Sequence, residues 1–387
     1  MSAEGCEVDQ QDCAGITPLA WAAKTGHERV VKMLLEQKNV DPNRQDAYGL
    51  TPLGWAVFNG QKGVVKLLLE KENVDPNRAD MHDQTPLVLA AIEGDEGVVK
   101  ILLEQENVDP NRPDKDGDGP LGCAAIRGHE GVIKLLLERK DIDLNRPNTE
   151  CNGPLWCAAI RGHQGVVKLL LERDNIDPNR QGKCDRTPLG CAALKGHEGV
   201  VKLLLGQESV DPNHPDEDGD GPLGCGAFYG HEGVVKLLLE RENVDPNHQN
   251  KNERTPLVCA AIEGHQGVVK LLLERENVDP NRPDEDGDSP LGCAAFCGHE
   301  GVVKLLLGRE NVNPNRRNND GQTPLVRAVM QGHEGVVKIL LEQGNINPNC
   351  PDKDGQGPLE WAAAKGHEGV VTLLLEQENI DPGAFEC

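Results

Sequence analysis

Short stretches of the chain carry apolar residues at helical spacing, separated by polar and turn-forming residues. In the stretch that begins at Thr51, the side chains of Leu53, Ala56 and Val57 fall at positions i, i+3 and i+4, on one face of a helix. Thr51 is a favoured N-cap, and the proline after it suits the first helical position. Gly60 can adopt the left-handed conformation that ends a helix. The pattern predicts a short helix between Thr51 and Gly60.

A second, more apolar helix is predicted over residues 63–70, where the sequence is Gly-Val-Val-Lys-Leu-Leu-Leu-Glu. Residues 73–78 contain Asp-Pro, which cannot continue a helix, so they are expected to form a loop. Residues 46–50, ahead of the first helix, have the composition of a tight β-turn. The unit is therefore turn, short helix, turn, longer helix and loop. Neither helix has enough apolar surface to be stable alone, so such units are expected to stack.

The unit recurs along the chain without insertion or deletion, as the dipeptide Pro-Leu shows. Every interval between successive Pro-Leu dipeptides is 34 residues, which gives eleven repeats. Their prolines are Pro18, Pro52, Pro86, Pro120, Pro154, Pro188, Pro222, Pro256, Pro290, Pro324 and Pro358. We predict that residues 12–383 form one continuous array of eleven repeats, with an N-terminal tail at 1–11 and a C-terminal tail at 384–387.

Three motifs of the unit resemble the ankyrin repeat: Thr-Pro-Leu-x-x-Ala-Ala, Gly-His-x-x-Val-Val-Lys-Leu-Leu-Leu-Glu and Asp-x-Asn. The resemblance covers roughly residues 12–383. It implies an all-α repeat solenoid in which helix-turn-helix units stack and short β-turns or hairpins project as tips. The unit is one residue longer than the usual ankyrin unit, and the extra residue lies in the Asn-Val-Asp-Pro-Asn loop.

Composition and charge exclude several classes of protein. The 387 residues include 64 Asp and Glu against 40 Lys and Arg, and the resulting net charge of −24 repels nucleic acid backbones and anionic membranes. No window approaches the 18 consecutive apolar residues of a membrane helix, and the N-terminal residues lack the apolar core of a signal peptide. We expect a soluble cytoplasmic protein that binds neither nucleic acid nor membrane.

A histidine follows the glycine between the two helices in nine repeats: His27, His129, His163, His197, His231, His265, His299, His333 and His367. Equivalent positions in stacked helical repeats are about 8–10 Å apart. A shared zinc ion needs its nitrogen ligands about 2.1 Å away, so we expect no metal site in this ladder. We interpret each histidine as a hydrogen-bonding partner of the backbone near the start of the second helix.

Cysteine forms a similar ladder, three residues after the proline of Pro-Leu: Cys123, Cys157, Cys191, Cys225, Cys259 and Cys293. The repeat spacing exceeds the roughly 7 Å between Cα atoms that a disulfide allows. We expect reduced cysteines in a reducing compartment, acting as small buried apolar residues at a position where other repeats carry Trp21, Trp55 and Trp361. No nucleophile elbow, P-loop or His-Glu-x-x-His motif is present. We expect no enzymatic activity, no catalytic residue and no cofactor.

One hairpin, residues 216–221, reads Asp-Glu-Asp-Gly-Asp-Gly and matches the first half of a calcium-binding EF-hand loop. The twelfth position of such a loop should be a bidentate glutamate, but here it is Ala227, inside a predicted helix. We interpret the segment as a solvated hairpin tip. Weak association of a cation at the tip is the alternative.

The repeats differ mainly in the last turn of the first helix and at the tips, whereas the second helix hardly varies. In the ankyrin family the sixth and seventh residues after the proline line the concave groove where partners usually dock, so the resemblance places a recognition surface there. The alternative is that the sixth position packs between neighbouring repeats. The candidate partner-binding residues of the groove are Phe58, Ile92, Ile126, Arg127, Ile160, Arg161, Leu194, Lys195, Phe228, Tyr229, Ile262, Phe296 and Met330.

The hairpin tips alternate in charge along the middle of the chain. The candidate partner-binding residues at the tips are Asp216, Glu217, Asp218, Lys251, Arg254, Asp284, Glu285 and Asp286. The alternation fits either mutual neutralisation of adjacent tips or recognition of a charged partner. The net charge of −24 favours a basic protein or peptide as the partner.

These features predict a protein–protein interaction module that binds through the groove and the tips. The alternative function is structural. The first repeat carries Val30 and Val31 and the last carries Val370 and Val371, so neither end has the polar face of a capping repeat. Contact between the last repeat of one chain and the first of another would be heterologous and would give rings or open filaments. Short tails acting as caps, or further flanking sequence, would prevent it.

Overall fold

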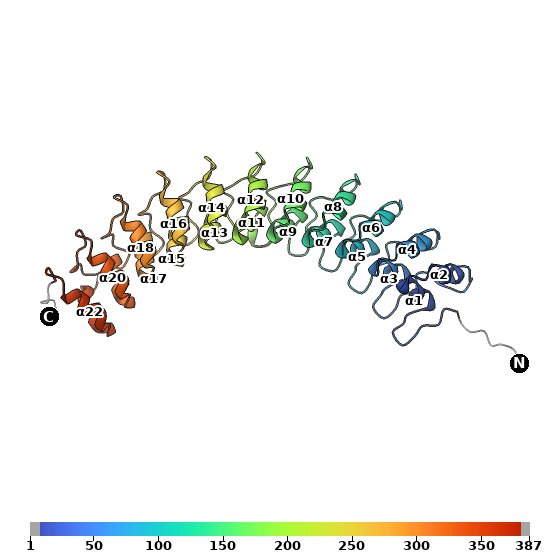
Figure 1. The fold of residues 1–387 in the computed structure, drawn as a ribbon, viewed down its shortest axis with the longest axis horizontal. Helices are drawn as coiled ribbons and strands as arrows, with labels where there is room; N and C mark the ends of the chain where they lie inside the picture. The colour runs from blue at the N-terminus through green and yellow to red at the C-terminus, as the bar shows by residue number, and fades with distance from the viewer. Residues whose placement is uncertain (1–7, 381–387) are drawn as a thin grey trace. The chain divides into compact units, whose positions relative to one another are not determined.

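The computed structural model describes residues 8–380, which contain 22 α-helices and no β-strand. The chain divides into two compact units, unit 1 ending at Lys183 and unit 2 beginning at Cys184. Five helix pairs lie in unit 1 and six in unit 2 (Figure 1). The prediction of an all-α repeat stack built from eleven helix pairs is therefore confirmed.

Unit 1 holds the first ten helices, and the odd number in each pair is the helix that Pro-Leu begins. Their bounds are α1 Pro18–Thr25, α2 Glu28–Leu35, α3 Pro52–Phe58, α4 Lys62–Leu69, α5 Pro86–Glu93, α6 Glu96–Leu103, α7 Pro120–Arg127, α8 Glu130–Leu137, α9 Pro154–Arg161 and α10 Gln164–Leu171. A single 3₁₀ turn, Lys183–Asp185, follows in the sequence.

Unit 2 holds the remaining twelve helices in the same alternation. They are α11 Pro188–Lys195, α12 Glu198–Leu205, α13 Pro222–Phe228, α14 Glu232–Leu239, α15 Pro256–Glu263, α16 Gln266–Leu273, α17 Pro290–Cys297, α18 Glu300–Leu307, α19 Pro324–Gln331, α20 Glu334–Leu341, α21 Pro358–Lys365 and α22 Glu368–Leu375.

The helices of each unit form two layers. The first helices of successive pairs pack on one another, as α3 does on α5, and the second helices do the same, as α4 does on α6. The core between the layers consists of leucine and alanine from the first helices and valine and leucine from the second. In the second pair, Leu53, Ala56, Val65 and Leu68 are fully buried. Stacking thus supplies the burial that a single pair could not achieve.

The helix ends follow the signals in the sequence. The side-chain oxygen of Thr51 accepts the backbone N–H of Gly54 at 3.1 Å and caps α3. At the end of α5, Gly94 has φ 75°, and a Cβ there would lie 2.7 Å from the ring of His129 in the next repeat. Both the left-handed backbone and the neighbouring ring therefore require glycine at this position.

From the fourth repeat on, ladder histidines join a repeat to the one before it. Nε2 of His129 lies 3.0 Å from the carbonyl oxygen of Ile92, in the last turn of the preceding first helix. Because a carbonyl can only accept, Nε2 is the protonated nitrogen. The prediction that the ladder histidine bonds to the backbone is therefore confirmed, and the accepting carbonyl lies in the previous repeat. Equivalent bonds join His163 to Ile126, His231 to Leu194, His265 to Phe228, His299 to Ile262, His333 to Phe296 and His367 to Met330.

An asparagine ladder joins the loops that follow the second helices. Nδ2 of Asn247 donates to the carbonyl of Asn277 at 2.6 Å, and its Oδ1 accepts the backbone N–H of Asp279 at 2.8 Å. One side chain thus satisfies two backbone groups of the next repeat. The same two bonds are made by Asn43, Asn77, Asn111, Asn145, Asn213, Asn281 and Asn315.

Replacing Asn247 with alanine removes both inter-repeat bonds and is expected to lower the free energy of unfolding by about 1–3 kcal/mol. The control is Asn277→Ala in the following loop, which keeps the backbone carbonyl that accepts the bond and changes an exposed side chain. It should change the free energy by less than about 0.5 kcal/mol. Urea denaturation followed by circular dichroism measures both. Equal losses from the two variants would show that the ladder does not hold the loops together.

Candidate functional site

The sixth-position residues lie on the last turn of the first helices, and their exposure is mixed. Phe58 and Phe228 are 49% and 37% exposed. The others of the predicted stripe are half-buried: Ile92, Ile126, Ile160, Leu194, Ile262, Phe296 and Met330. These side chains therefore pack against their neighbours and present one edge to solvent. The seventh-position residues Arg127, Arg161, Lys195 and Tyr229 are all exposed.

In unit 2, the exposed aromatic side chains form one cluster. The rings of Phe228 and Tyr229 meet edge to face with centroids 5.1 Å apart, and Tyr229 stacks on His231 at 6.2 Å. The carbonyl of Phe228 accepts the bond from Nε2 of His265 at 2.9 Å, which holds the backbone beneath the cluster. A rigidly held pair of exposed aromatic side chains has the properties of an interface anchor.

The ring of Phe296 is less accessible to a binding partner than its position in the repeat predicts. The guanidinium of Arg327 lies 4.0 Å from its ring centroid, in a cation–π contact, and also forms an ion pair of 2.9 Å with Asp288. Arg327 occupies the position where other repeats carry cysteine or tryptophan. One face of the Phe296 ring is therefore covered by the chain itself.

In unit 1, a groove of about 640 Å³ lies between the first helices and the hairpin tips. We name it the aromatic groove; its walls include Trp21, Tyr48, Trp55, Phe58 and Met81. All of these except Trp55 are exposed, by 44% to 54%. Only Phe58 was predicted as a site residue. The signal in the sequence is that Tyr48 and Met81 are apolar at tips where later repeats carry charged residues.

Lysine and carboxylate groups complete the aromatic groove. The ammonium of Lys24 lies 3.9 Å from the ring centroid of Trp55 and 5.0 Å from that of Trp21. The indole N–H of Trp55 donates to Oδ2 of Asp46 at 2.7 Å, and that of Trp21 to Oδ2 of Asp12 at 2.9 Å. Both indoles are therefore fixed in orientation. Trp55 is only 8% exposed and lies beneath the Lys24 ammonium, whereas Trp21 is 44% exposed.

The ladder position of tryptophan and cysteine is more than a buried apolar position. Trp361 donates to Asp352 at 2.8 Å, and the sulfur of Cys123 lies 3.8 Å from Oδ2 of Asp114. In each case the acceptor is the aspartate nine residues earlier, at the start of the hairpin. The expected burial of the six ladder cysteines is confirmed. In Cys123, Cys225 and Cys293 the thiol is in addition placed to donate to the carboxylate of this aspartate.

Two of the predicted tip residues are not at the surface. Asp216 and Asp284 are buried, with 8% and 5% exposure. Oδ1 of Asp216 accepts the backbone N–H groups of Asp218 and Asp220, and its Oδ2 pairs with Arg186. Because these carboxylates hold the turns, Asp216 and Asp284 are not available to a partner.

The other predicted tip residues lie outward. Arg254 is half-buried, and the exposed ones are Glu217, Asp218, Lys251, Glu285 and Asp286. A backbone bond from Lys251 to the carbonyl of Asp218, 3.0 Å long, fixes the spacing of their two tips. Among residues 8–380, no group of histidine, cysteine and acidic side chains is placed to hold a metal ion.

Burial alters the acidity of some hairpin carboxylates. Desolvation raises the pKa of Asp118 to about 6, and the nearby charges of Asp114 and Asp116 act in the same direction. A bond from Nδ2 of Asn148, 3.3 Å long, opposes the shift. Desolvation likewise raises the pKa of Asp288 to about 6, although the charge of Arg327 lowers it. These groups hold their protons more tightly in the folded chain than in the unfolded one.

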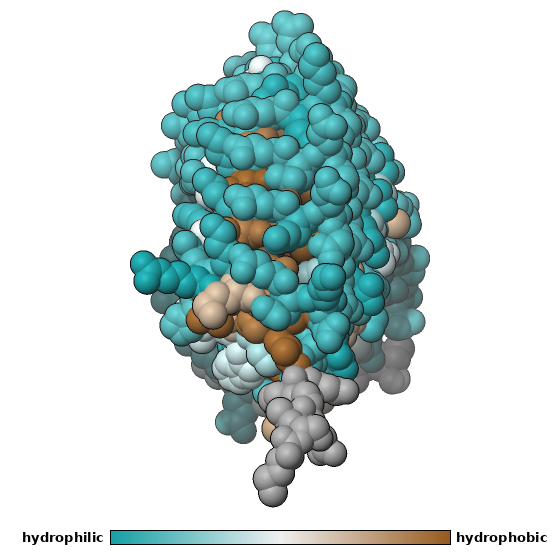
Figure 2. Space-filling model, turned by 90° about the vertical axis from the view of Figure 1, so that its right-hand side faces the viewer, coloured by the Kyte–Doolittle hydropathy of each residue, from teal (hydrophilic) through white to brown (hydrophobic). Residues whose placement is uncertain are grey.

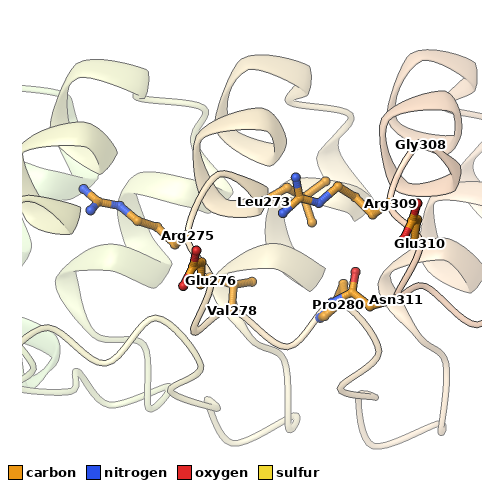
Figure 3. A pocket seen from close by; sticks show the side chains of 9 residues that line it. All are labelled: Leu273, Arg275, Glu276, Val278, Pro280, Gly308, Arg309, Glu310 and Asn311. Carbon is orange, nitrogen blue, oxygen red and sulfur yellow. The ribbon is translucent and has the colours of Figure 1, made fainter.

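A second hollow, of about 420 Å³, lies in unit 2 beside the ends of α16 and α18 (Figure 3). In Figure 3, Arg309 extends toward Leu273, Arg275 points away from the other labelled side chains, and Glu276 and Glu310 come from the loops below. Gly308 stands where the preceding repeat has a glutamate, which leaves the hollow open. Its charges are of both signs and it has no aromatic wall, so it is a weaker candidate than the aromatic groove.

Comparison with known proteins agrees with this architecture. A model of three ankyrin repeats matches residues 1–80, 72–148, 223–318 and 302–385, and a model of many ankyrin repeats matches 155–205 and 195–239. The chain belongs to the ankyrin repeat family. The solved ankyrin repeat domain of Bcl-3, described as a unique member of the IkappaB protein family, is 24% identical. The match covers 58% of this chain and 99% of that one, with a TM-score of 0.52, and shows a shared fold.

A search of curated protein sequences found no match to this ankyrin repeat chain. Ankyrin repeats are in general protein–protein interaction modules rather than enzymes. Within residues 8–380, none of the helices has the length and apolar character needed to cross a membrane.

The raised pKa of Asp118 predicts a dependence of stability on pH. Between about pH 4 and 6 the folded chain binds a proton that the unfolded chain has released, so stability falls as pH rises through this window. Asp118→Asn carries no charge, so its melting temperature should exceed that of wild type at pH 7.5 and match it near pH 4. Calorimetry at both pH values measures the difference. The exposed neighbour Asp116→Asn is the control, and identical pH profiles for wild type and Asp118→Asn would contradict the assignment.

Proposed function

We propose that this chain recognises a partner protein through the groove formed by the last turns of its first helices and the adjacent tips. One observation carries the proposal. Nine large apolar residues are exposed within residues 8–380, and six of them lie in the aromatic groove or in the Phe228–Tyr229 cluster. In a chain with only ten aromatic residues, this concentration of exposed aromatic surface favours a binding role.

Binding costs less free energy when the interface side chains are already ordered. The bond from His265 holds the helix end that carries Phe228, and the indole of Trp21 is held by its bond to Asp12. Aromatic side chains contribute large contact areas at small entropic cost, so Trp21, Phe58, Phe228 and Tyr229 are the proposed anchors. Within each unit, the half-buried sixth-position residues beside these anchors would exclude water from the interface.

The charge of the chain indicates the kind of partner. With a net charge of −24, the chain attracts basic segments over long distances and repels acidic ones. The exposed tips of unit 2 contribute Glu217, Asp218, Glu285 and Asp286 to this field. We propose a basic protein or peptide in the cytoplasm, since every cysteine described in residues 8–380 is free, as expected in a reducing compartment.

The groove is tested by changing Phe228 and Tyr229 to serine. Because both side chains are exposed, the free energy of unfolding should change by less than about 1 kcal/mol. In quantitative affinity capture from a lysate of the source, the variant should capture at least tenfold less of the proteins that wild type binds. The control variant, Lys236→Ser with Glu240→Ser, changes an exposed residue of α14 and the exposed residue that follows this helix, and it should still capture these proteins. Destabilisation by several kcal/mol, or undiminished capture, would refute this use of the cluster.

A second candidate function, end-to-end self-association, is favoured by the outward faces of the first and last repeats. Val30 and Met33 are 44% and 66% exposed, and Figure 2, which looks onto the N-terminal end, shows hydrophobic surface beside the grey residues. At the other end, Leu375 is 54% exposed. A Cβ added at Gly366 would meet no atom, whereas at its equivalent Gly230 the next repeat's histidine fills the space.

Light scattering over a wide range of concentration tests the second candidate. Wild type should gain mass with concentration, and Met33→Glu should suppress the gain because a charge would be buried in the contact. The control, Met81→Glu, makes the same change at an exposed methionine of the aromatic groove and should associate like wild type. A monomeric mass at every concentration would eliminate end-to-end association.

A further inference from the structure

The aspartate that begins a hairpin usually has both carboxylate oxygens occupied. In the second repeat, Oδ1 of Asp46 accepts the backbone N–H groups of Tyr48 and Leu50, both at 2.9 Å. Its Oδ2 accepts the indole N–H of Trp55 at 2.7 Å. Asp12 is satisfied in the same way, with Trp21 as the side-chain donor.

The third repeat breaks this rule. Oδ1 of Asp80 accepts the backbone N–H groups of His82 and Gln84, at 2.8 and 2.9 Å. The residue nine positions later is Leu89, which has no polar hydrogen to donate. Within residues 8–380, no group of the chain donates to Oδ2 of Asp80 or forms an ion pair with its carboxylate. Asp80 therefore carries a charged acceptor that its own repeat leaves unused.

The unused oxygen belongs to a residue of the aromatic groove. Asp80 is half-exposed and lines the groove together with Leu89, Trp55 and Phe58. The carboxylates in the lining are Asp12 and Asp80 and the one ammonium group is that of Lys24, so carboxylates outnumber ammonium groups. Lys24 does not neutralise Asp80, because its ammonium lies over the ring of Trp55.

We propose that the aromatic groove binds a basic side chain, arginine or lysine, of a partner peptide, with its cation paired to Oδ2 of Asp80. The aliphatic stem of the basic residue would lie on the exposed ring of Phe58, as long cationic side chains do on apolar surfaces. A neighbouring apolar residue of the peptide would fill the hollow beside Met81 and Tyr48. Lys24, whose ammonium lies over the rings of Trp55 and Trp21, is an example of a cation held against the aromatic wall of this groove.

This inference rests on the proposed function and names the chemistry of its partner. A peptide carrying a carboxylate instead would meet Asp80 with the same sign of charge, which disfavours it. An uncharged apolar peptide would fill the groove and leave Oδ2 unpaired. Pairing with Asp80 would therefore favour a basic peptide over an acidic peptide and over an uncharged apolar one.

The test uses the full-length chain and two libraries of amidated nonapeptides, one with arginine and one with glutamate fixed at the centre. Immobilised protein should enrich peptides from the arginine library and not from the glutamate library. The tightest peptide is then remade with citrulline, which has the shape of arginine without its charge. Fluorescence anisotropy should show binding at least about tenfold weaker for the citrulline peptide, as expected for loss of a charge-assisted bond.

Variants of the chain locate the effect. Asp80→Asn should weaken the arginine peptide about tenfold and leave the citrulline peptide unchanged. Asparagine holds this turn elsewhere in the chain, since Oδ1 of Asn148 accepts the N–H groups of Glu150 and Asn152. Asp83→Asn removes the same charge from an exposed residue of the same hairpin and should leave affinity unchanged.

A second variant keeps the charge of Asp80 but occupies its Oδ2 with a hydrogen bond from within the chain. Leu89→Trp supplies Asp80 with the indole donor that Trp55 gives to Asp46, and it should weaken the arginine peptide to the level seen with Asp80→Asn. Equal enrichment of both libraries, or a change below twofold in Asp80→Asn, would overturn the inference. Loss of arginine-peptide binding in Phe228→Ser with Tyr229→Ser, but not in Asp80→Asn, would also overturn it and leave the proposed function standing.

Discussion

The hydrogen bond from a histidine ring to the last-turn carbonyl of the preceding first helix is the contact that holds the sixth-position residues from Ile92 to Met330. The last carbonyls of a helix have no partner within it, and here the next repeat provides one. The residue that owns the carbonyl also points its side chain into the groove, so the bond to Phe228 from His265 fixes the backbone of a proposed anchor. The left-handed glycine beside each histidine is needed because the ring occupies the space of a Cβ.

The bonds that join repeats use groups that the groove does not need. Asn247 bonds to backbone atoms of the next loop, and His265 bonds to a backbone oxygen, so neither depends on which side chain stands at the sixth or seventh position. The junctions therefore stay equivalent while the groove changes from Phe228 and Tyr229 to Ile262 and Glu263. A constant scaffold with a variable surface follows from this division between backbone and side-chain contacts.

The fold was largely predictable from the sequence, because its signals are local. Thr51, the proline after it and the glycines at helix ends each act within one turn, and their spacing repeats without change. The buried position of Asp216 was not predictable in this way. An acidic hairpin indicates solvated charge, whereas the carboxylate is turned inward to hold two backbone N–H groups.

The aromatic groove was missed for a different reason. Trp21, Tyr48 and Met81 are far apart in the sequence and come from a helix and two tips, so only the stacking of three repeats brings them together. The unused oxygen of Asp80 is visible only when its hairpin is compared with those of Asp46 and Asp12. The oxygen is unused because Leu89 replaces a residue that could donate a hydrogen bond. The pattern of residue types within one repeat does not show that such a donor is missing.

The equivalence of the junctions has a consequence for how such a chain can change in length. Because the Asn247 side chain contacts only backbone atoms of the following loop, a duplicated or deleted block of 34 residues would present the same atoms to its new neighbour. The number of repeats can thus grow or shrink in whole units with every new boundary already compatible. Gain or loss of a block would bring different groove residues side by side, so new binding surfaces can arise by recombination alone, with no point mutation in the scaffold.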